Sequence, residues 1–356
     1  MIPKKQALIP FVCLTLTLLV ACEPLAPEQT PHVIVVTGET PQSGTLQPTS
    51  LLSGTVTPGT AVANAGGVVN TPIPSPTLTP PATATPTATP FVCAESAGQV
   101  IESSFASAVI GDDVSFRMYL PPCFYETFQR YPYVILLHGS GYTETMWEDL
   151  GAPLTMDQGI SKGTLPPMVL IMPDGGLAAE LNDAPDNISY EAVILEELIP
   201  LVESEFCLWG NRQGRAIGGI SRGGFWAFSI GLRHPELFSA VGGHSPHFEE
   251  DNAPPEINPL NLAGRVNLDK FPLRIYMDNG ANDVVGQNVI RMSDTLRENG
   301  ITHNYVINPT GNHDMDYWQA HAAEYLSFYG QTWPSDVRAL PSCLEPSPTD
   351  EPTSSP

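Results

Sequence analysis

Between residues 114 and 328, short apolar runs alternate with longer segments of helical period, and this alternation limits the chain to few folds. Continuous apolar runs of this length are typical of strands that are covered on both faces. The expected strands are 114–120, 133–137, 168–172, 216–220, 238–242, 273–277 and 303–307, and the expected helices are 190–206, 224–234, 285–299 and 315–328. Strands that alternate with helices predict an α/β fold, with a mainly parallel central sheet and helices on both faces.

The composition changes sharply on both sides of this region. Residues 23–92 are rich in Thr, Pro, Ala, Gly and Ser and contain almost no aromatic residues. Such a segment cannot bury enough apolar surface to offset its ordering entropy, so we predict a disordered linker there and a disordered tail at 344–356. The domain then spans 93–343 and has a single core. The apolar patch 32–37 within the linker has the pattern of a strand, but alone it has no partner.

The first 22 residues have the pattern of a secretory signal. Lys4 and Lys5 precede an apolar run that is too short for a comfortable transmembrane span. The residues Leu19, Val20, Ala21 and Cys22 resemble the lipobox of bacterial lipoproteins, in which the cysteine becomes the lipidated first residue. We therefore expect an extracytoplasmic protein that is held at a membrane only through a lipid on Cys22. An ordinary cleaved signal peptide is the alternative.

The other cysteines predict disulfide bonds in an exported domain. Apart from Cys13 and Cys22 in the signal segment, the chain contains Cys93, Cys123, Cys207 and Cys343. Three pairings are possible, and we favour 93 with 123 and 207 with 343, because each would join a domain edge to a nearby element. Free buried cysteines are the alternative. The absence of CxxC and Cys/His clusters argues against a zinc or iron site, and we expect no cofactor.

The net charge of the chain argues against negatively charged partners. Fifteen basic and 38 acidic residues give a formal charge of −23. This charge opposes binding to nucleic acid and to anionic surfaces.

The stretch GGISRGG, residues 218–224, connects an expected strand to an expected helix. Its pattern Gly219-x-Ser221-x-Gly223 matches a nucleophile elbow, in which a sharp turn exposes a serine and small neighbours prevent collisions with the adjoining strand and helix. Ser221 is therefore the candidate nucleophile. A serine hydroxyl is a poor nucleophile near neutral pH and needs a histidine base and an acid, which should follow it in the order acid, then histidine.

His313 is the candidate base, because it lies in a loop between the strand 303–307 and the last helix. For the acid, Asp283 lies in a loop beyond Gly280, and we favour it over Asp278, which is nearer the strand end and suited to organising the turn. Among the other histidines, His303 and His321 fit packing or surface positions. His244 and His247 could contact substrate; with Glu249, Glu250 and Asp251 they could also form a metal site, but the spacing matches no recognised ligand set.

An acyl-transfer site also needs backbone donors for the oxyanion. The N–H of Arg222, which follows the nucleophile, is one candidate. The second is the N–H of Ser140 in the turn His138–Gly141, directly after the strand 133–137. The ring of His138 is interpreted as holding this loop.

Five stretches occur in a characteristic order: LPPCFYETFQRYPYVILLHGSG, MVLIMPDGG, GGISRGGFWAFSIGLRHPELF, MDNGANDVV and PTGNHDMDYW. Together they resemble the esterase D family of α/β-hydrolases, also called the putative esterase family, which includes feruloyl, acetyl xylan and enterochelin-type esterases, S-formylglutathione hydrolases and mycolyltransferases. The resemblance covers about 100–330. It implies the α/β-hydrolase fold, with Ser221 as nucleophile, Asp283 as acid, His313 as base, and Ser140 and Arg222 as oxyanion donors. In two departures, Arg222 stands where many members carry methionine, and Asn312 replaces a common glycine.

These features predict a serine esterase without metal or cofactor that acts on an extracytoplasmic ester, with feruloyl or acetyl esters of polysaccharide as candidates. Tyr142 and Trp318, with Trp147 and Tyr317 nearby, could line a substrate pocket, and ordinary packing is the alternative. Three alternative functions are possible from the sequence: an acyltransferase of the same fold, a non-catalytic surface binding protein, and a protease. No residue specifically favours the protease.

Overall fold

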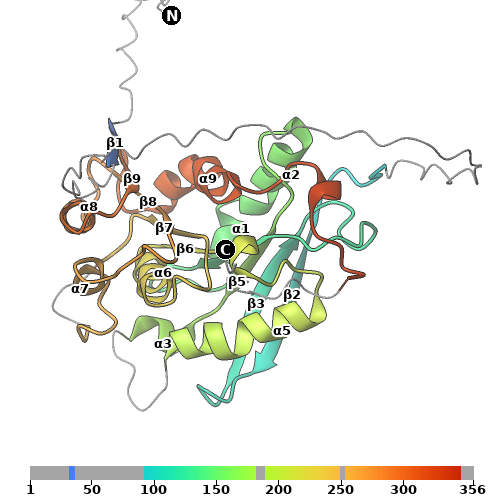
Figure 1. Ribbon diagram of the computed structural model, residues 1–356, viewed down its shortest axis with the longest axis horizontal. Coiled ribbons are helices and arrows are strands. Elements are labelled where there is room, and N and C mark those ends of the chain that lie inside the picture. Colours follow the sequence, from blue (N-terminus) through green and yellow to red (C-terminus); the bar gives the residue numbers. More distant parts are fainter. Residues whose placement is uncertain (1–31, 37–91, 182–188, 249–252, 346–356) are drawn as a thin grey trace, which may run out of the picture.

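The computed structural model of the protein describes residues 32–36, 92–181, 189–248 and 253–345 (Figure 1). The predicted signal segment with Cys22, most of the predicted linker and the tail beyond 345 lie outside these residues. The acidic residues 249–251 of the alternative metal site also lie outside them.

A nine-stranded sheet forms the centre of the molecule, in the order β1-β9-β8-β7-β6-β4-β5-β3-β2. The six strands from β5 to β9 in this order pair in parallel, whereas β3, β2 and β1 are antiparallel at the edges. The strands are β1 His32–Val36, β2 Gln99–Ala106, β3 Asp113–Leu120, β4 Tyr133–Leu137, β5 Val169–Pro173, β6 Arg215–Ile220, β7 Ala240–His244, β8 Arg274–Gly280 and β9 His303–Asn308.

Helices cover both faces of this sheet, as the alternating pattern predicts (Figure 1). They are α1 Met146–Asp149, α2 Ala152–Lys162, α3 Gly176–Glu180, α4 Tyr190–Ala192, α5 Ile199–Glu205, α6 Arg222–Arg233, α7 Pro259–Ala263, α8 Gly286–Glu298 and α9 Met315–Gly330. A π-helical segment, Val193–Leu198, connects α4 to α5, so the expected helix 190–206 is one continuous helical segment with a widened middle. This arrangement is the α/β-hydrolase fold.

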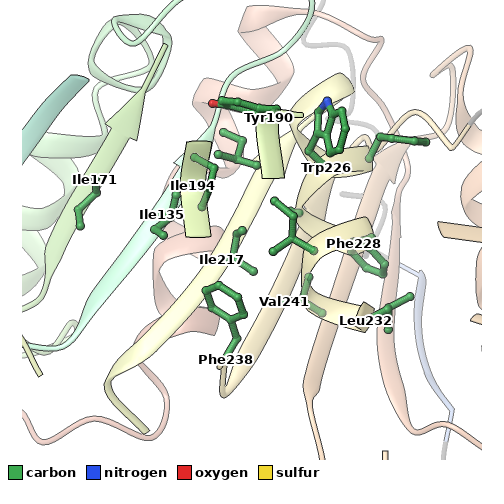
Figure 2. Close-up of a cluster of buried hydrophobic side chains, with 14 of the residues drawn as sticks. Ile135, Ile171, Tyr190, Ile194, Ile217, Trp226, Phe228, Leu232, Phe238 and Val241 are labelled. Atoms are coloured by element: carbon green, nitrogen blue, oxygen red, sulfur yellow. The ribbon is translucent and has the colours of Figure 1, made fainter. Parts of the chain in front are cut away.

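Two apolar clusters, one on each face, join the helices to the sheet. On one face, side chains of α6 and of the segment from Tyr190 to Glu205 pack on the central strands; Figure 2 shows Ile135, Ile217 and Val241 of the sheet beside Ile194 and Trp226. On the other face, α1, α2 and α9 contribute the second cluster, which includes Trp147, Met156 and Leu326. Nearly all of α6 is buried, and its residues are mostly apolar, with Arg222, Ser229 and Arg233 along one side of the helix.

The expected strands are all present, with boundaries that differ by up to a few residues. The largest difference is in β8, which ends at Gly280 instead of residue 277, and β7 is shifted by two residues at both ends. The edge strand β2 and the helices α2 and α7 were not expected. One expectation was wrong: the apolar patch in the N-terminal segment does have a partner, because β1 pairs antiparallel with β9 from His32 opposite Ile307 to Val36 opposite His303.

Both favoured disulfide bonds are present, Cys93–Cys123 and Cys207–Cys343, with Cα–Cα distances of 5.8 and 5.9 Å. Disulfide bonds of this kind indicate an oxidising compartment. Among the described residues, no helix is both long and apolar enough to cross a membrane. The same part of the chain contains no cluster of three or more acidic, histidine or cysteine side chains that could hold a metal ion.

The two disulfide bonds should differ in their contribution to stability. They close loops with sequence separations of 30 and 136 residues. Because a longer loop loses more entropy in the unfolded state, removing Cys207–Cys343 should cost about 1 kcal/mol more free energy of unfolding than removing Cys93–Cys123. Urea unfolding of the two double alanine variants would measure this difference. The opposite order of stabilities would contradict the loop-length argument.

Candidate active site

Ser221 lies at the turn between β6 and α6, and its backbone has φ 53° and ψ −114°. A positive φ is unfavourable for a residue with a side chain and persists only where the surroundings enforce it. Here the neighbouring strand and its loop supply the restraint: the Ser221 N–H donates to the His244 carbonyl at 3.0 Å, and the His247 N–H donates to the Ser221 carbonyl at 3.0 Å. The hydroxyl is therefore presented in a fixed position.

Two glycines make this turn possible. A Cβ on Gly219 would lie 2.9 Å from the Cα of Gly223, and a Cβ on Gly223 would lie 2.6 Å from the His138 carbonyl oxygen. Real Cβ atoms essentially never approach backbone atoms this closely. Glycine at both positions thus lets the start of α6 touch the end of β4 and the loop that follows it.

The structure brings Ser221, His313 and Asp283 together from three loops. His313 precedes α9, and its Nε2 lies 2.8 Å from the Ser221 Oγ. Its Nδ1 lies 3.0 Å from Asp283 Oδ1, in the loop between β8 and α8. With the proton on Nδ1, the imidazole donates to the carboxylate and accepts from the serine hydroxyl. The three side chains therefore form a continuous chain of hydrogen bonds.

Asp283 is held in its charged form. Burial alone would raise the pKa of this carboxyl, but the hydrogen bonds from His313 and from the Val285 N–H outweigh it and lower the pKa below its ordinary value. The carboxylate is thus ionised at neutral pH, which suits a group that orients an imidazole.

Asp278, the less favoured candidate acid, lies apart from His313 in a fully buried network. Its carboxylate accepts from Tyr317 at 2.5 Å and from Tyr325 at 3.1 Å, and it lies 3.3 Å from His244 Nδ1. His244 Nε2 is 2.9 Å from the Tyr329 hydroxyl. This network was not predicted from the sequence, although Tyr317, Tyr325 and Tyr329, at spacings of eight and four residues, lie near one face of α9.

One sequence interpretation is therefore corrected. His244 was considered as a substrate contact, but its side chain is fully buried. Burial lowers the pKa of its imidazole, so the ring is neutral at pH 7. The ring contacts Asp278 and Tyr329 at the end of β7, where the His244 carbonyl accepts from the Ser221 N–H.

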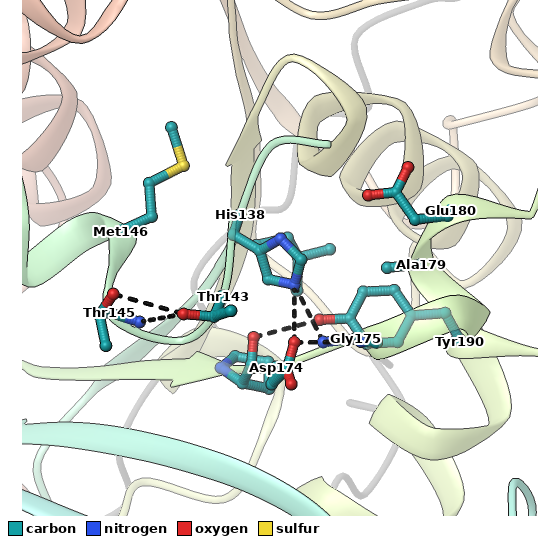
Figure 3. A network of polar contacts seen from close by, with 12 residues as sticks. His138, Thr143, Thr145, Met146, Asp174, Gly175, Ala179, Glu180 and Tyr190 are labelled. Atoms are coloured by element: carbon teal, nitrogen blue, oxygen red, sulfur yellow. Dashed lines mark hydrogen bonds and ion pairs between the residues drawn. The ribbon is translucent and has the colours of Figure 1, made fainter. Parts of the chain in front are cut away.

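The loop after β4 lies beside Ser221, since a Cβ on Gly139 would be 3.5 Å from the Ser221 Cβ. The ring of His138 holds this loop, as interpreted: its Nδ1 donates to the Gly139 carbonyl at 2.9 Å, and its Nε2 accepts from the Gly175 N–H at 2.9 Å. Figure 3 shows the His138 ring pointing at Gly175 and Asp174. Ser140, the predicted second oxyanion donor, is part of this loop.

The two aromatic residues predicted to bind substrate differ in exposure. Tyr142 is 39% exposed, whereas Trp318 is 2% exposed and packs edge-on against the His313 ring at 5.1 Å. Of the pair, Tyr142 is the one with surface available to a ligand. A cavity of about 610 Å³ between α2, β9 and α9 includes none of Ser221, Asp283 and His313, so it is separate from this site.

Comparison with known proteins identifies the family. The model of the putative esterase family matches residues 107–329, which is more than half of the chain. The chain belongs to the putative esterase family. The match contains Ser221, Asp283 and His313 and the loop after β4.

Curated relatives are similar to this family member in sequence over about 40% of its length. An endo-1,4-beta-xylanase/feruloyl esterase of Xylanibacter ruminicola is 31% identical over 157 residues, which cover 41% of this chain and 21% of the relative. An esterase of Mycobacterium tuberculosis is 26% identical over 147 residues, covering 40% of this chain and 31% of the relative. The chain thus spans about a fifth to a third of the length of these relatives.

Solved structures match the fold of this putative esterase family member over almost their whole length. A ferulic acid esterase superposes with a TM-score of 0.61 at 23% identity, covering 67% of this chain and 99% of that one. S-formylglutathione hydrolase from Staphylococcus aureus superposes with a TM-score of 0.55 at 21% identity, covering 65% and 98%. These likenesses support the α/β-hydrolase fold.

The elbow of this family member should not tolerate a side chain at Gly223. Gly223→Ala should lower the free energy of unfolding by about 2–3 kcal/mol, because the added methyl group would overlap the carbonyls of Leu137 and His138. Gly264→Ala is a matched control, since its Cβ would meet Thr295 at an ordinary 3.7 Å. Urea unfolding of both variants checks the prediction, and equal stabilities would contradict it.

The lowered pKa of Asp283 predicts a pH-dependent contribution to stability. A carboxyl whose folded pKa is depressed stabilises the folded state above its unfolded pKa of about 4, and this contribution is lost as the pH falls through the folded pKa. Asp283→Asn should therefore be less stable than the native chain at pH 7, and the difference should shrink below about pH 4. Unfolding curves between pH 7 and pH 3 measure it; a constant difference would show that the carboxylate is not stabilised.

Proposed function

We propose that this protein is a serine carboxylic-ester hydrolase with Ser221 as nucleophile, His313 as general base and Asp283 as the orienting acid. The observation that carries the proposal is the pair of contacts from His313, 2.8 Å to the Ser221 Oγ and 3.0 Å to Asp283 Oδ1. Membership of the putative esterase family supports the same chemistry.

In the first half of the reaction, the Ser221 Oγ attacks the ester carbonyl carbon while its proton moves to His313 Nε2. The imidazolium that forms is stabilised by the ionised Asp283. When the tetrahedral intermediate collapses, the bond to the alcohol oxygen breaks, and Nε2 gives its proton to that oxygen. The product of this half is an acyl-serine and a free alcohol.

In the second half, water attacks the acyl carbon and gives a proton to His313 Nε2. The bond from carbon to the Ser221 Oγ then breaks, the serine takes back the proton, and the carboxylic acid leaves. Both tetrahedral intermediates carry a negative oxygen, for which the N–H groups of Ser140 and Arg222 are the proposed donors. No step of this scheme calls for a metal or a cofactor.

For the substrate, we propose an extracytoplasmic ester, with feruloyl or acetyl groups on polysaccharide as the class to test first. Support comes from the feruloyl esterase in the name of one relative and from the two disulfide bonds, which indicate an oxidising compartment. Tyr142, which is 39% exposed, lies next to the loop His138–Gly141, called here the oxyanion loop, and is the proposed aromatic contact to substrate. Lipidation at Cys22 would hold the enzyme at a membrane surface.

Ser221→Ala and His313→Ala should each lower kcat on short aryl esters by about 10³-fold or more, because each removes a member of one catalytic unit. A fluorophosphonate probe should label the native chain and not the serine variant. His303→Ala is the control for loss of an imidazole elsewhere, since His303 is buried in β9 and bonds to Ser293 at 2.8 Å. Full activity of the Ser221 variant would refute the proposed mechanism.

The same assays separate the remaining functions. An acyltransferase would shift the product from free acid to sugar ester when sugar acceptors are added, whereas a hydrolase would continue to release acid. A binding protein without catalysis would give neither a fluorophosphonate adduct nor turnover of aryl, acetyl-xylan and feruloyl esters. Relative kcat/KM across that panel identifies the preferred acyl group.

A further inference from the structure

The side chain of Arg222 reaches away from Ser221 toward α3. Its side chain is 9% exposed and lies over the ring of Phe225 at 4.7 Å. From there the guanidinium donates to two carbonyls at the end of α3: Nε to Ala179 at 2.6 Å, and Nη2 to Leu181. The residue that follows the nucleophile is thus bonded through its side chain to a separate helix.

Glu180 lies between those two carbonyls, and its carboxylate bonds to the oxyanion loop. Oε2 accepts from the Ser140 hydroxyl at 2.5 Å, and Oε1 accepts from the Gly141 N–H at 2.9 Å. Burial would raise the pKa of Glu180, but these two bonds, with the charge of Arg222, lower it, so the carboxylate is ionised at neutral pH. Both oxygens are therefore acceptors for the loop.

Taken together, these contacts form one connected path: Arg222, the end of α3, Glu180, and the loop at Ser140 and Gly141. We propose that Arg222 and Glu180 are positioning residues, which fix the oxyanion loop relative to the nucleophile elbow and so keep the N–H groups of Ser140 and Arg222 aimed at one point. This inference rests on the proposed esterase function and extends it to two side chains that touch no reacting atom.

The physical reason for such a bridge is that the two donors belong to different loops. Donors stabilise an oxyanion only when both lie within about 3 Å of the position that it occupies in the transition state. The N–H of Arg222 is fixed by the elbow, but Ser140 lies in an exposed turn after β4. A charged carboxylate with two bonds to that turn restrains it, and the guanidinium restrains the carboxylate's own helix.

The test is a double-variant cycle on the full-length chain with a short aryl ester. Glu180→Ala and Arg222→Met should each lower kcat about tenfold with little change in KM, because the loss affects the transition state and not substrate binding. The double variant should lose about as much as the more damaged single variant, since both break the same path. Glu180→Gln, which keeps one acceptor oxygen, should fall between Glu180→Ala and the native chain.

Two further measurements distinguish positioning from a general effect of charge or folding. Glu144→Gln removes a nearby carboxylate that makes no bond to Ser140 or Gly141, and it should leave kcat unchanged. The melting temperatures of the Glu180 variants should stay close to that of the native chain, since Glu180 is largely exposed and only part of its surface is buried. If Arg222→Met does not fold, Ser140→Ala replaces it in the cycle, because it removes one of the bonds that Glu180 receives.

Each outcome has a defined meaning. If the native chain neither hydrolyses esters nor reacts with the fluorophosphonate, the proposed function itself fails. If the native chain is active but Glu180→Ala keeps kcat within about twofold, the positioning role alone is refuted. Losses that multiply in the double variant, or an equal loss in Glu144→Gln, would also overturn it.

Discussion

The backbone contact between the start of α6 and the end of β4 is the constraint on which the candidate site depends. Because Gly219 and Gly223 lack side chains, the elbow approaches the carbonyls of Leu137 and His138 closely enough to bring the oxyanion loop beside Ser221. At this turn Ser221 adopts a positive φ of 53°. Hydrogen bonds from the β7 end then hold this conformation. One local packing arrangement thus places Ser221 beside the loop after β4, which holds the proposed oxyanion donor Ser140.

The parallel sheet completes the arrangement, because its strands end at a common edge. Ser221, Asp283 and His313 follow β6, β8 and β9, which are near neighbours in the sheet order. Below them, the buried Asp278 and its tyrosine partners fill the space between β8 and α9. A polar group this deep in the protein is tolerated because hydrogen bonds compensate its lost hydration. A fully buried polar network therefore lies beneath the loops that carry the candidate site.

Local patterns in the sequence predicted all six parallel strands and the elbow, because these depend on neighbouring residues. Both disulfide bonds were predicted because only four cysteines lie in the expected domain. The choice of Asp283 over Asp278 agrees with the observed contact to His313. Three contacts between distant segments that no motif marks escaped prediction. The pairing of β1 with β9, the burial of His244 and the bonds of Glu180 each join segments far apart in the chain. No short-range pattern encodes such contacts.

The position of β1 has a consequence for how the protein behaves when shortened. This strand occupies the outer side of β9, the strand that leads into the His313 loop. A fragment that starts at Cys93 would leave that side with unpaired amides and carbonyls, which invite pairing with a second molecule. The strand β1 thus covers an edge of the sheet that would otherwise be open to pairing with another molecule. Truncation at residue 93 should therefore increase the tendency of the protein to aggregate.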